Sequence, residues 1–565
     1  MSINSWTKIA PPDLKFAEDR IDAPEFGDSY FQPLKVVSSQ EHRSTSVQDE
    51  TRYTFLQGTD LGERFARRVG GQFCVAELGL GSGANLCETF RFWQASVNRP
   101  NRLDYLAFEA RPFSIQQLQR AEQAHKIDLS PLMQALAVDP HYPVPGISRH
   151  CLAPGFWLTL VLGDVQDTLA WFKNSLVDAW YLDGFAPARN QGIWSAETIK
   201  AVGRLTRPGG CFATFTAASM VRKELELAGF VVRKTAGFGP KRERLVGQKC
   251  GRFENALPSE VQIAGAGIMG SWAGHIAQLA GIKSYLYDPK GRLNGPGSAT
   301  LVPAIDWRPT LDFARQGRLA FTSFVWASRA YQQYFPDACH LGPMTALERR
   351  IWPSFSKWGF PDPIPTDDVW STGERLYAVP GTLILNRDAL CFLGEIQLEK
   401  LDNFTQANLV AVGHVGPGVN STIRGQQSLY SCFDPLPERA LKCGKLGGGT
   451  GEKQFFIGSS FEREHGPDWH CPQAKDDHEA LEAFGKAARL PNLGSEPVRQ
   501  WSGLRAVSVD RFPNYFKQTA LPWSIGALGS HGFTLAPLLA EQWLSDLVGA
   551  PNVIDVDLLA SMERR

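Results

Sequence analysis

Residues 75–85 contain the side chains and spacing with the clearest chemical potential. An apolar run typical of a strand leads into Gly79, Gly81 and Gly83, and a segment typical of a helix follows over 86–94. Glycines allow positive φ and close approach of the backbone to a ligand, and a helix start offers unpaired N–H groups. The spacing is G-x-G-x-G, not G-x-G-x-x-G. It predicts a nucleoside-type ligand without a pyrophosphate; an ordinary strand-to-helix turn is the alternative.

Acidic side chains accompany the predicted strands around this loop. Glu77 precedes the glycines, and Glu109 and Asp164 each follow an apolar segment. Carboxylates at the carboxyl edge of a parallel sheet can accept hydrogen bonds from a ligand. Rossmann-like methyltransferases have this arrangement, so we expect an S-adenosylmethionine site. Glu109 would accept from the ribose and Asp164 from the adenine amino group, with Glu77, the glycines and Asn85 completing the site.

Asp183 ends a further predicted strand, over 178–182, and is followed by Phe185 and Pro187. Its position resembles the acidic or amide position that N-methyltransferases place near the acceptor nitrogen. An amine must be neutral to attack a methyl sulfonium, and a carboxylate in a partly dry pocket can orient it and accept its proton. We therefore predict a catalytic Asp183; a turn or N-cap aspartate is the alternative.

The most basic run of the chain covers residues 233–244, with five cations and one anion around glycines and an aromatic residue. Such a run suits phosphate contact and base stacking. It includes Lys241 and Arg242. A solvated charged face is the alternative.

A second nucleotide pattern begins at residue 261. A predicted strand over 261–264 leads into Gly265, Gly267 and Gly270, which form a complete G-x-G-x-x-G, and a predicted helix follows. The next strand ends at Asp288, roughly 20 residues further on, where an acid that binds ribose is expected. With strand, helix and acid all present, the pattern predicts dinucleotide binding.

The nature of the dinucleotide is indicated far along the chain. A strand over 524–528, a turn with Gly529 and Gly532, and a helix over 534–548 resemble the closing element of amine-oxidising flavoproteins. There the helix N-terminus stabilises negative charge on the reduced flavin. We therefore expect FAD. Upstream, Arg505 is a candidate for holding a substrate carboxylate; a surface ion pair is the alternative.

Composition sets the broad class. The 565 residues suggest two to four domains, and 43% hydrophobic and 21% charged residues are ordinary for a globular protein. The formal net charge is zero, so a nucleic-acid site must be a local patch. Ten cysteines without a C-x-x-C pair suggest reduced thiols, no metal site and a cytoplasmic protein. Residues 261–282 could span a bilayer in length, but their polar residues and glycines favour a strand-turn-helix, so we expect no membrane contact.

Five blocks together carry a family resemblance. Residues 50–55, 77–85, 181–190, 214–218 and 237–243, including D-G-F-A-P and G-F-G-x-K-R-E, resemble the methyltransferase half of the MnmC family, the bacterial bifunctional tRNA 5-methylaminomethyl-2-thiouridine biosynthesis proteins. The resemblance continues near Arg505 in the oxidase half. It implies an α/β fold: a Rossmann-like methyltransferase domain with an N-terminal extension over 1–250, a linker over 251–260, and an amino-acid-oxidase-like FAD domain with a mixed-sheet substrate region over 261–565.

The resemblance also implies an activity. The FAD domain would remove the carboxymethyl arm of 5-carboxymethylaminomethyl uridine at the wobble position, and the other domain would methylate the resulting aminomethyl group. Arg52, Phe185, Lys241 and Arg242 would bind the substrate, which is the anticodon region of tRNA. We expect the protein to act as a monomer.

The sequence departs from the family in its second half. Residues 295–303 only partly match the block that usually follows the ribose acid, and the chain is short between 386–390 and 409–413. We therefore expect fewer strands in the substrate region. A methyltransferase with a degenerate flavin domain, an amino-acid oxidase fused to a small-molecule methyltransferase, and a tRNA-binding protein without activity remain alternatives.

Overall fold

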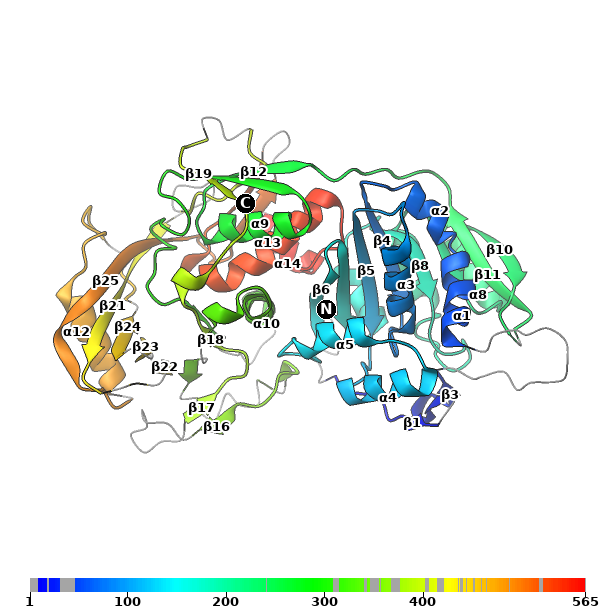
Figure 1. Ribbon diagram of the computed structural model, residues 1–565, viewed down its shortest axis with the longest axis horizontal. Helices are drawn as coiled ribbons and strands as arrows, with labels where there is room; N and C mark the ends of the chain where they lie inside the picture. Colours follow the sequence, from blue (N-terminus) through cyan, green and yellow to red (C-terminus); the bar gives the residue numbers. More distant parts are fainter. Residues whose placement is uncertain are drawn as a thin grey trace. The chain divides into compact units, whose positions relative to one another are not determined.

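The structure is a computed structural model of the chain (Figure 1). It describes residues 9–17, 20–30, 46–239, 241–307, 314–339, 343–345, 355, 357–366, 376–401, 406–413, 421–434, 436, 440–443, 445–450, 453–458, 460–463, 465–486, 488–517 and 522–563. Pro240 of the basic run lies outside them. Two compact units are present: unit 1 comprises residues 1–258 and 545–556, and unit 2 comprises residues 259–544 and 557–565.

Unit 1 is built on an eight-stranded sheet in the order β10-β11-β9-β8-β4-β5-β7-β6. Its strands are β4 (Gln72–Leu78), β5 (Arg102–Glu109), β6 (Gly146–Ala153), β7 (Phe156–Leu162), β8 (Val177–Leu182), β9 (Thr206–Thr214), β10 (Phe230–Ala236) and β11 (Glu243–Lys249). The five central strands are parallel. All residues of β4, β7 and β8 are buried, as expected of parallel strands covered on both faces.

Helices of unit 1 connect and cover these strands (Figure 1). They are α1 (Val47–Thr51), the π-helix η3 (Arg52–Gln57), α2 (Leu61–Ala66), α3 (Ala84–Ala95), α4 (Ile115–His125), α5 (Ser130–Ala137), α6 (Val165–Thr168), η4 (Leu169–Trp171), α7 (Ala196–Leu205) and α8 (Ser219–Leu227). A small N-terminal sheet contains β1 (Lys15–Phe16), β2 (Ile21–Ala23) and β3 (Asp28–Ser29), with η2 (Pro24–Phe26) between the last two. Along β4, Val75 and Ala76 belong to different apolar clusters, since successive side chains point to opposite faces.

The chain order of the strands reverses at β4. From β4 the chain passes to β5 and β7 on one side, and later returns to β8 on the other side. Open α/β sheets bind ligands outside the carboxyl ends of the strands at such a switch point. The glycine loop follows β4 and Asp183 follows β8, so topology alone brings these two sequence motifs together.

The segment 545–556 packs with unit 1 although it lies near the end of the chain. Arg149 donates from Nη1 to Ser545 Oγ at 2.8 Å and from Nη2 to the Pro551 carbonyl at 2.6 Å, and Lys173 pairs with Asp546 at 2.6 Å. The domain boundary that the sequence predicted at 251–260 divides the chain once and does not assign residues 545–556 to the first unit.

Unit 2 contains a six-stranded sheet in the order β19-β13-β12-β20-β27-β26. Its strands are β12 (Glu260–Ala264), β13 (Lys283–Tyr287), β19 (Glu395–Gln397), β20 (Leu409–Val410), β26 (Asn514–Lys517) and β27 (Trp523–Gly526). The helical elements of this unit are α9 (Ile268–Leu279), α10 (Arg315–Tyr334), η5 (Pro336–Ala338), η7 (Arg387–Ala389), α12 (Ala474–Gly485), η10 (Gly529–His531), α13 (Gly532–Val548) and α14 (Val556–Glu563), of which α13 and α14 also contribute residues to unit 1. The segment 261–282 is therefore a strand and a helix, as predicted. Among the described residues, no helix has both the length and the apolar character that crossing a membrane requires.

A second sheet of unit 2 has eight strands in the order β16-β17-β15-β22-β23-β24-β21-β25. They are β15 (Pro343–Thr345), β16 (Ile364–Thr366), β17 (Leu376–Ala378), β21 (Ser421–Cys432), β22 (Ala440–Cys443), β23 (Lys445–Gly449), β24 (Gln454–Gly458) and β25 (Leu493–Val507), and β14 (Ala304–Ile305) pairs separately with β18 (Leu383–Ile384). Because its strands come from either side of the short segment 386–413, that segment does not prevent a large sheet. The predicted α/β class with a mixed sheet is confirmed.

Candidate active site

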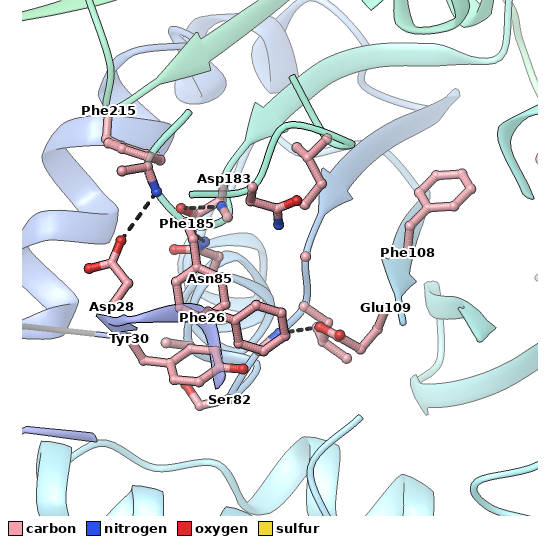
Figure 2. Close-up of a pocket in the computed structure, with 18 of the residues that line it drawn as sticks. Phe26, Asp28, Tyr30, Ser82, Asn85, Phe108, Glu109, Asp183, Phe185 and Phe215 are labelled. Carbon is pink, nitrogen blue, oxygen red and sulfur yellow. Dashed lines mark hydrogen bonds between the residues drawn. The ribbon is translucent and has the colours of Figure 1, made fainter. Parts of the chain in front are cut away.

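A cavity of about 530 Å³ lies at the carboxyl ends of the parallel strands of unit 1 (Figure 2). The glycine loop after β4, Glu109 after β5, Asp164 after β7 and Asp183 after β8 all line it. The structure thus brings together in one cavity most of the unit 1 residues that the sequence singled out.

The glycine loop has a conformation that requires glycine. Gly79, Gly81 and Gly83 have φ values of 85°, 54° and 78°. A Cβ on Gly81 would lie 2.9 Å from the Tyr30 ring, and a Cβ on Gly83 would lie 2.3 Å from Leu132. The loop is therefore both left-handed and tightly covered, and Gly83 is the N-cap of α3 without a side-chain cap.

Glu109 connects β5 to this loop. Its Oε2 accepts from the Gly81 amide at 2.9 Å, and its Oε1 accepts from the Arg111 amide at 2.8 Å. Burial raises the pKa of the Glu109 carboxyl, and the backbone amides lower it. Asp164 is the N-cap of α6 and accepts from the Gln166 amide at 2.9 Å. Both carboxylates line the cavity, which suits their predicted roles as hydrogen-bond acceptors for a methyl donor.

Asp183 has a defined orientation in the cavity wall (Figure 2). Its Oδ1 accepts from the Gly184 amide at 2.9 Å, and its Oδ2 accepts from Asn85 Nδ2 at 2.8 Å. Burial raises the pKa of the Asp183 carboxyl to about 6; Glu50 raises it and Lys241 lowers it. A carboxylate with a pKa near neutrality is suited to accept a proton.

Glu77 is placed differently from Glu109 and Asp164. Its side chain is fully buried, and the cavity lining does not include it. Asn85 Nδ2 donates to Glu77 Oε1 at 2.6 Å, and the Tyr105 hydroxyl lies 2.7 Å from Oε2. Glu77 lies behind Asn85, which lines the cavity, and its contact with a methyl donor stays a prediction.

Several lining residues were missed by sequence reasoning. Phe26 stacks on Phe185 with ring centroids 4.6 Å apart, and Tyr30 meets the same ring edge-on at 5.2 Å. Asp28 accepts from the Ala186 amide at 3.3 Å (Figure 2). These residues come from η2 and the adjoining chain, which has the aromatic character that could have suggested a cover but no spacing that indicates a site.

The predicted substrate-binding residues divide into two groups. Lys241 lines the cavity, pairs with Glu50 at 3.1 Å and lies 4.4 Å from the centroid of the Phe215 ring. Arg52 and Arg242 are exposed and absent from the lining, and Arg52 pairs with Glu88 at 2.5 Å. Phe185 lines the cavity.

In unit 2 the G-x-G-x-x-G loop connects β12 to α9. A Cβ on Gly270 would lie 1.8 Å from the Gly265 carbonyl oxygen, so glycine is required for the helix to pack on the loop. Asp288 accepts from the Ala266 amide at 3.0 Å. The Ile268 amide at the start of α9, next to Gly267, donates to Ser298 Oγ at 3.0 Å. Ser298 belongs to the block in which the sequence departs from its family.

Arg505 in β25 and the closing glycines before α13 also belong to unit 2, and a Cβ on Gly532 would lie 3.4 Å from Ile268 at the start of α9. Arg505 is buried, donates from Nη1 to the Ser460 carbonyl at 3.2 Å, and lies 4.8 Å from the Phe461 ring centroid. Burial lowers the pKa of its guanidinium to about 10. Among the described residues no carboxylate pairs with it, which argues against the surface ion pair. Gly529 has a φ of 58°, and Gly532 is the first residue of α13.

Known proteins resemble this chain over nearly its whole length. A family model for S-adenosyl-L-methionine-dependent methyltransferases matches residues 131–250. The tRNA 5-methylaminomethyl-2-thiouridine biosynthesis bifunctional protein MnmC of Maricaulis maris is 30% identical over 543 residues, which cover 89% of this chain and 88% of the relative. The chain belongs to the MnmC family. The MnmC protein of Caulobacter vibrioides is also 30% identical, over 97% of this chain and 96% of its own.

Solved structures give weaker similarities. Glycine oxidase from Geobacillus kaustophilus is 14% identical with a TM-score of 0.42, over 54% of this chain and 99% of its own. MnmC2 from Aquifex aeolicus is 18% identical with a TM-score of 0.33, over 44% and 74%. At these TM-scores the likeness supports no inference. Membership of the MnmC family confirms the predicted family and an enzyme with a methyltransferase half.

Proposed function

We propose that this MnmC-family enzyme modifies the wobble uridine of tRNA in two steps. Unit 2 oxidises the C–N bond to the carboxymethyl arm of 5-carboxymethylaminomethyl uridine with FAD as the two-electron acceptor, and water then hydrolyses the imine to leave the primary amine. Unit 1 methylates this amine with S-adenosylmethionine as the donor. The oxidation comes first because it produces the primary amine that the methylation consumes.

The cavity of unit 1 supports the methylation. Its glycine loop, Glu109 and Asp164 suit the nucleoside part of the donor, and the aromatic cover of Phe26, Tyr30 and Phe185 limits access of water. The donor supplies an electrophilic methyl group. The single observation that carries the proposal is Asp183, which faces the same cavity with a carboxyl pKa of about 6.

Asp183 has two tasks in this mechanism. Its carboxylate orients the amine, which must present a free electron pair, and it accepts the proton that the nitrogen loses. Lys241 and Glu50, paired at 3.1 Å beside Asp183, neutralise each other, so Asp183 supplies the net negative charge of this group of three. A cationic or neutral amine fits this charge better than an anionic group does.

Unit 2 fits the adenosine and pyrophosphate end of FAD. The close packing of Gly270 on Gly265 and the carboxylate of Asp288 match the requirements of a dinucleotide loop. When bound, FAD supplies a two-electron oxidant. We assign to Gly529 and Gly532, at the start of α13, the flavin end, and to Arg505 the carboxylate of the substrate arm, since its guanidinium has no described acidic partner.

One experiment separates this function from its alternatives. The purified protein is tested anaerobically with carboxymethylaminomethyl tRNA, and separately with aminomethyl tRNA plus the methyl donor. We expect a yellow protein, flavin reduction by the first tRNA and methylation of the second. Methylation with a flavin that stays oxidised would establish the degenerate flavin domain, and activity on free amino acids but not on tRNA would overturn the tRNA assignment.

A further inference from the structure

A buried polar network lies behind Asp183 and contains two residues to which the mechanism above gives no task. We propose that Glu77 and Thr51 are positioning residues for methyl transfer: acting through Asn85, they fix the orientation in which Asp183 receives the proton of the amine. This inference rests on the proposed methylation by unit 1.

The Asn85 amide is the centre of the network. Its Nδ2 donates to Asp183 Oδ2 at 2.8 Å and to Glu77 Oε1 at 2.6 Å. Its Oδ1 accepts from Thr51 Oγ1 at 2.7 Å. Both N–H groups and the carbonyl are therefore engaged, and a rotation or flip of this amide would break three hydrogen bonds at once. With Asn85 fixed, Oδ2 of Asp183 is fixed too.

Glu77 serves this network as a buried hydrogen-bond acceptor. Its carboxyl is fully buried and is bonded to the Asn85 amide and the Tyr105 hydroxyl, neither of which is a cation. Burial raises the pKa of Glu77 well above its usual value, and the charge of Asp183 raises it further. Glu77 accepts from Asn85 Nδ2 through Oε1 and from the Tyr105 hydroxyl through Oε2. Through Oε1 it orients the Asn85 amide whose second N–H bonds Asp183.

Thr51 completes the arrangement from a different element. It is the last residue of α1, is 3% exposed, and lines the cavity. Its hydroxyl donates to the Asn85 carbonyl oxygen at 2.7 Å, which leaves the amide nitrogen facing Asp183, whose ionised carboxylate can only accept. Thr51 of α1 and Glu77 of β4 thus meet Asn85 of α3, and Asn85 in turn bonds Asp183 after β8. These elements supply the rigidity that a catalytic carboxylate needs.

The test compares variants of nearly equal volume. Glu77→Leu and Thr51→Val remove a hydrogen-bonding group, whereas Glu77→Gln keeps a side chain of similar shape with an oxygen that can accept from Asn85. We expect Glu77→Leu to lower single-turnover methylation roughly 10- to 100-fold, as misplacement of a catalytic group does, and Thr51→Val to lower it less. Donor affinity by calorimetry and KM for aminomethyl tRNA should stay within about twofold in both, and the combined reduction should be less than the product of the two, because both act through Asn85.

Rescue is the decisive readout. Glu77→Gln should keep near-normal turnover, with the acid limb of the pH profile still near pH 6, because its amide oxygen can still accept from Asn85. Weak donor binding by Glu77→Leu with normal turnover of the saturated enzyme would establish a donor ligand and overturn the proposal, as would an equal reduction in Glu77→Gln and Glu77→Leu. If Glu77→Leu fails to fold, unchanged turnover in Thr51→Val overturns the role of Asn85 orientation. A wild-type protein that binds donor but does not methylate aminomethyl tRNA instead refutes the proposed function.

Discussion

The two glycine loops of this chain are held by the same kind of hydrogen bond but lead into helices with different surroundings. In each unit a carboxylate at the end of the neighbouring strand accepts from a loop amide: Glu109 from Gly81 at 2.9 Å, and Asp288 from Ala266 at 3.0 Å. The acid therefore helps to fix the conformation of the loop. A sequence motif shows such an acid only as a ligand contact.

The loops differ at the start of the following helix. In unit 2 the first amide of α9, that of Ile268, donates to Ser298 Oγ, so a side chain from the departing block 295–303 covers the helix start. In unit 1 the N-cap of α3 is Gly83 without a side-chain cap, and Asn85 in the first turn points to Asp183. The two helix starts therefore have different partners: a serine hydroxyl meets the first amide of α9, and a side chain in the first turn of α3 meets Asp183.

The largest expected effect concerns the catalytic side of this comparison. Asp183→Asn should lower methylation roughly 10²- to 10⁴-fold, the usual contribution of general-base catalysis, with donor affinity largely intact. Because the carboxyl must be deprotonated to accept a proton, wild-type single-turnover rates should fall below about pH 6, where its pKa lies. Rate profiles against pH check both. Near-normal methylation by the variant would make Asp183 a turn residue.

A backbone change tests the dinucleotide side. Gly270→Ala places a Cβ 1.8 Å from the Gly265 carbonyl oxygen, whereas Gly295→Ala meets no atom within 4 Å and is the matched control. Overpacking costs about 1–3 kcal/mol, so FAD affinity of the apoprotein should fall roughly 10- to 100-fold in the first variant only. Fluorescence titration with FAD measures it. Equal affinities would remove the G-x-G-x-x-G loop from the FAD site.

The sequence was sufficient to locate both loops, because the conformation that requires each glycine is set by residues close to it in the chain. Positive φ at Gly81 and close packing at Gly270 leave a pattern within a few residues. The parallel strand ends also predicted that Glu109, Asp164 and Asp183 share one cavity. Those features follow from α/β topology, which hydrophobic periodicity and turn residues reveal.

Other features depend on interactions between distant residues and left no pattern. Asn85 meets Thr51 from 34 positions away and Asp183 from 98, so the network behind Asp183 cannot be read from spacing. The sequence motif suggested a donor contact for Glu77 and could not show its bond to Asn85. The aromatic cover from Phe26 and the return of 545–556 to unit 1 are likewise products of tertiary packing.

A smaller effect concerns the free energy of unfolding, which the buried charge of Asp183 lowers. Its folded-state pKa, about 6, lies above the value of 3.8 for an unperturbed carboxyl, so the folded protein binds the proton more tightly. Above about pH 6 the charged form of Asp183 therefore lowers the free energy of unfolding by its full amount. This reduction disappears as pH falls toward about 4. Asp183→Asn should raise stability by about 1–3 kcal/mol at about pH 7 to 8, since cavity solvent reduces the full shift. Thermal unfolding across pH measures the difference, and an equal gain at about pH 4 would contradict this origin.

The smallest expected effect separates the two predicted phosphate contacts. Removing a cation that binds a phosphate should reduce the slope of log affinity against log salt by about 0.7 to 0.9. Both side chains are exposed, but Lys241 lines the cavity and already pairs with Glu50 at 3.1 Å, whereas Arg242 is absent from the lining. Arg242→Ala should therefore lower the slope for tRNA, and Lys241→Ala should leave it nearly unchanged while altering the pH profile of methylation, because Lys241 lowers the pKa of Asp183.

Binding assays at several salt concentrations check this. Equal slope changes would place both side chains on phosphates, and no change in either would make this part of the basic run a solvated face.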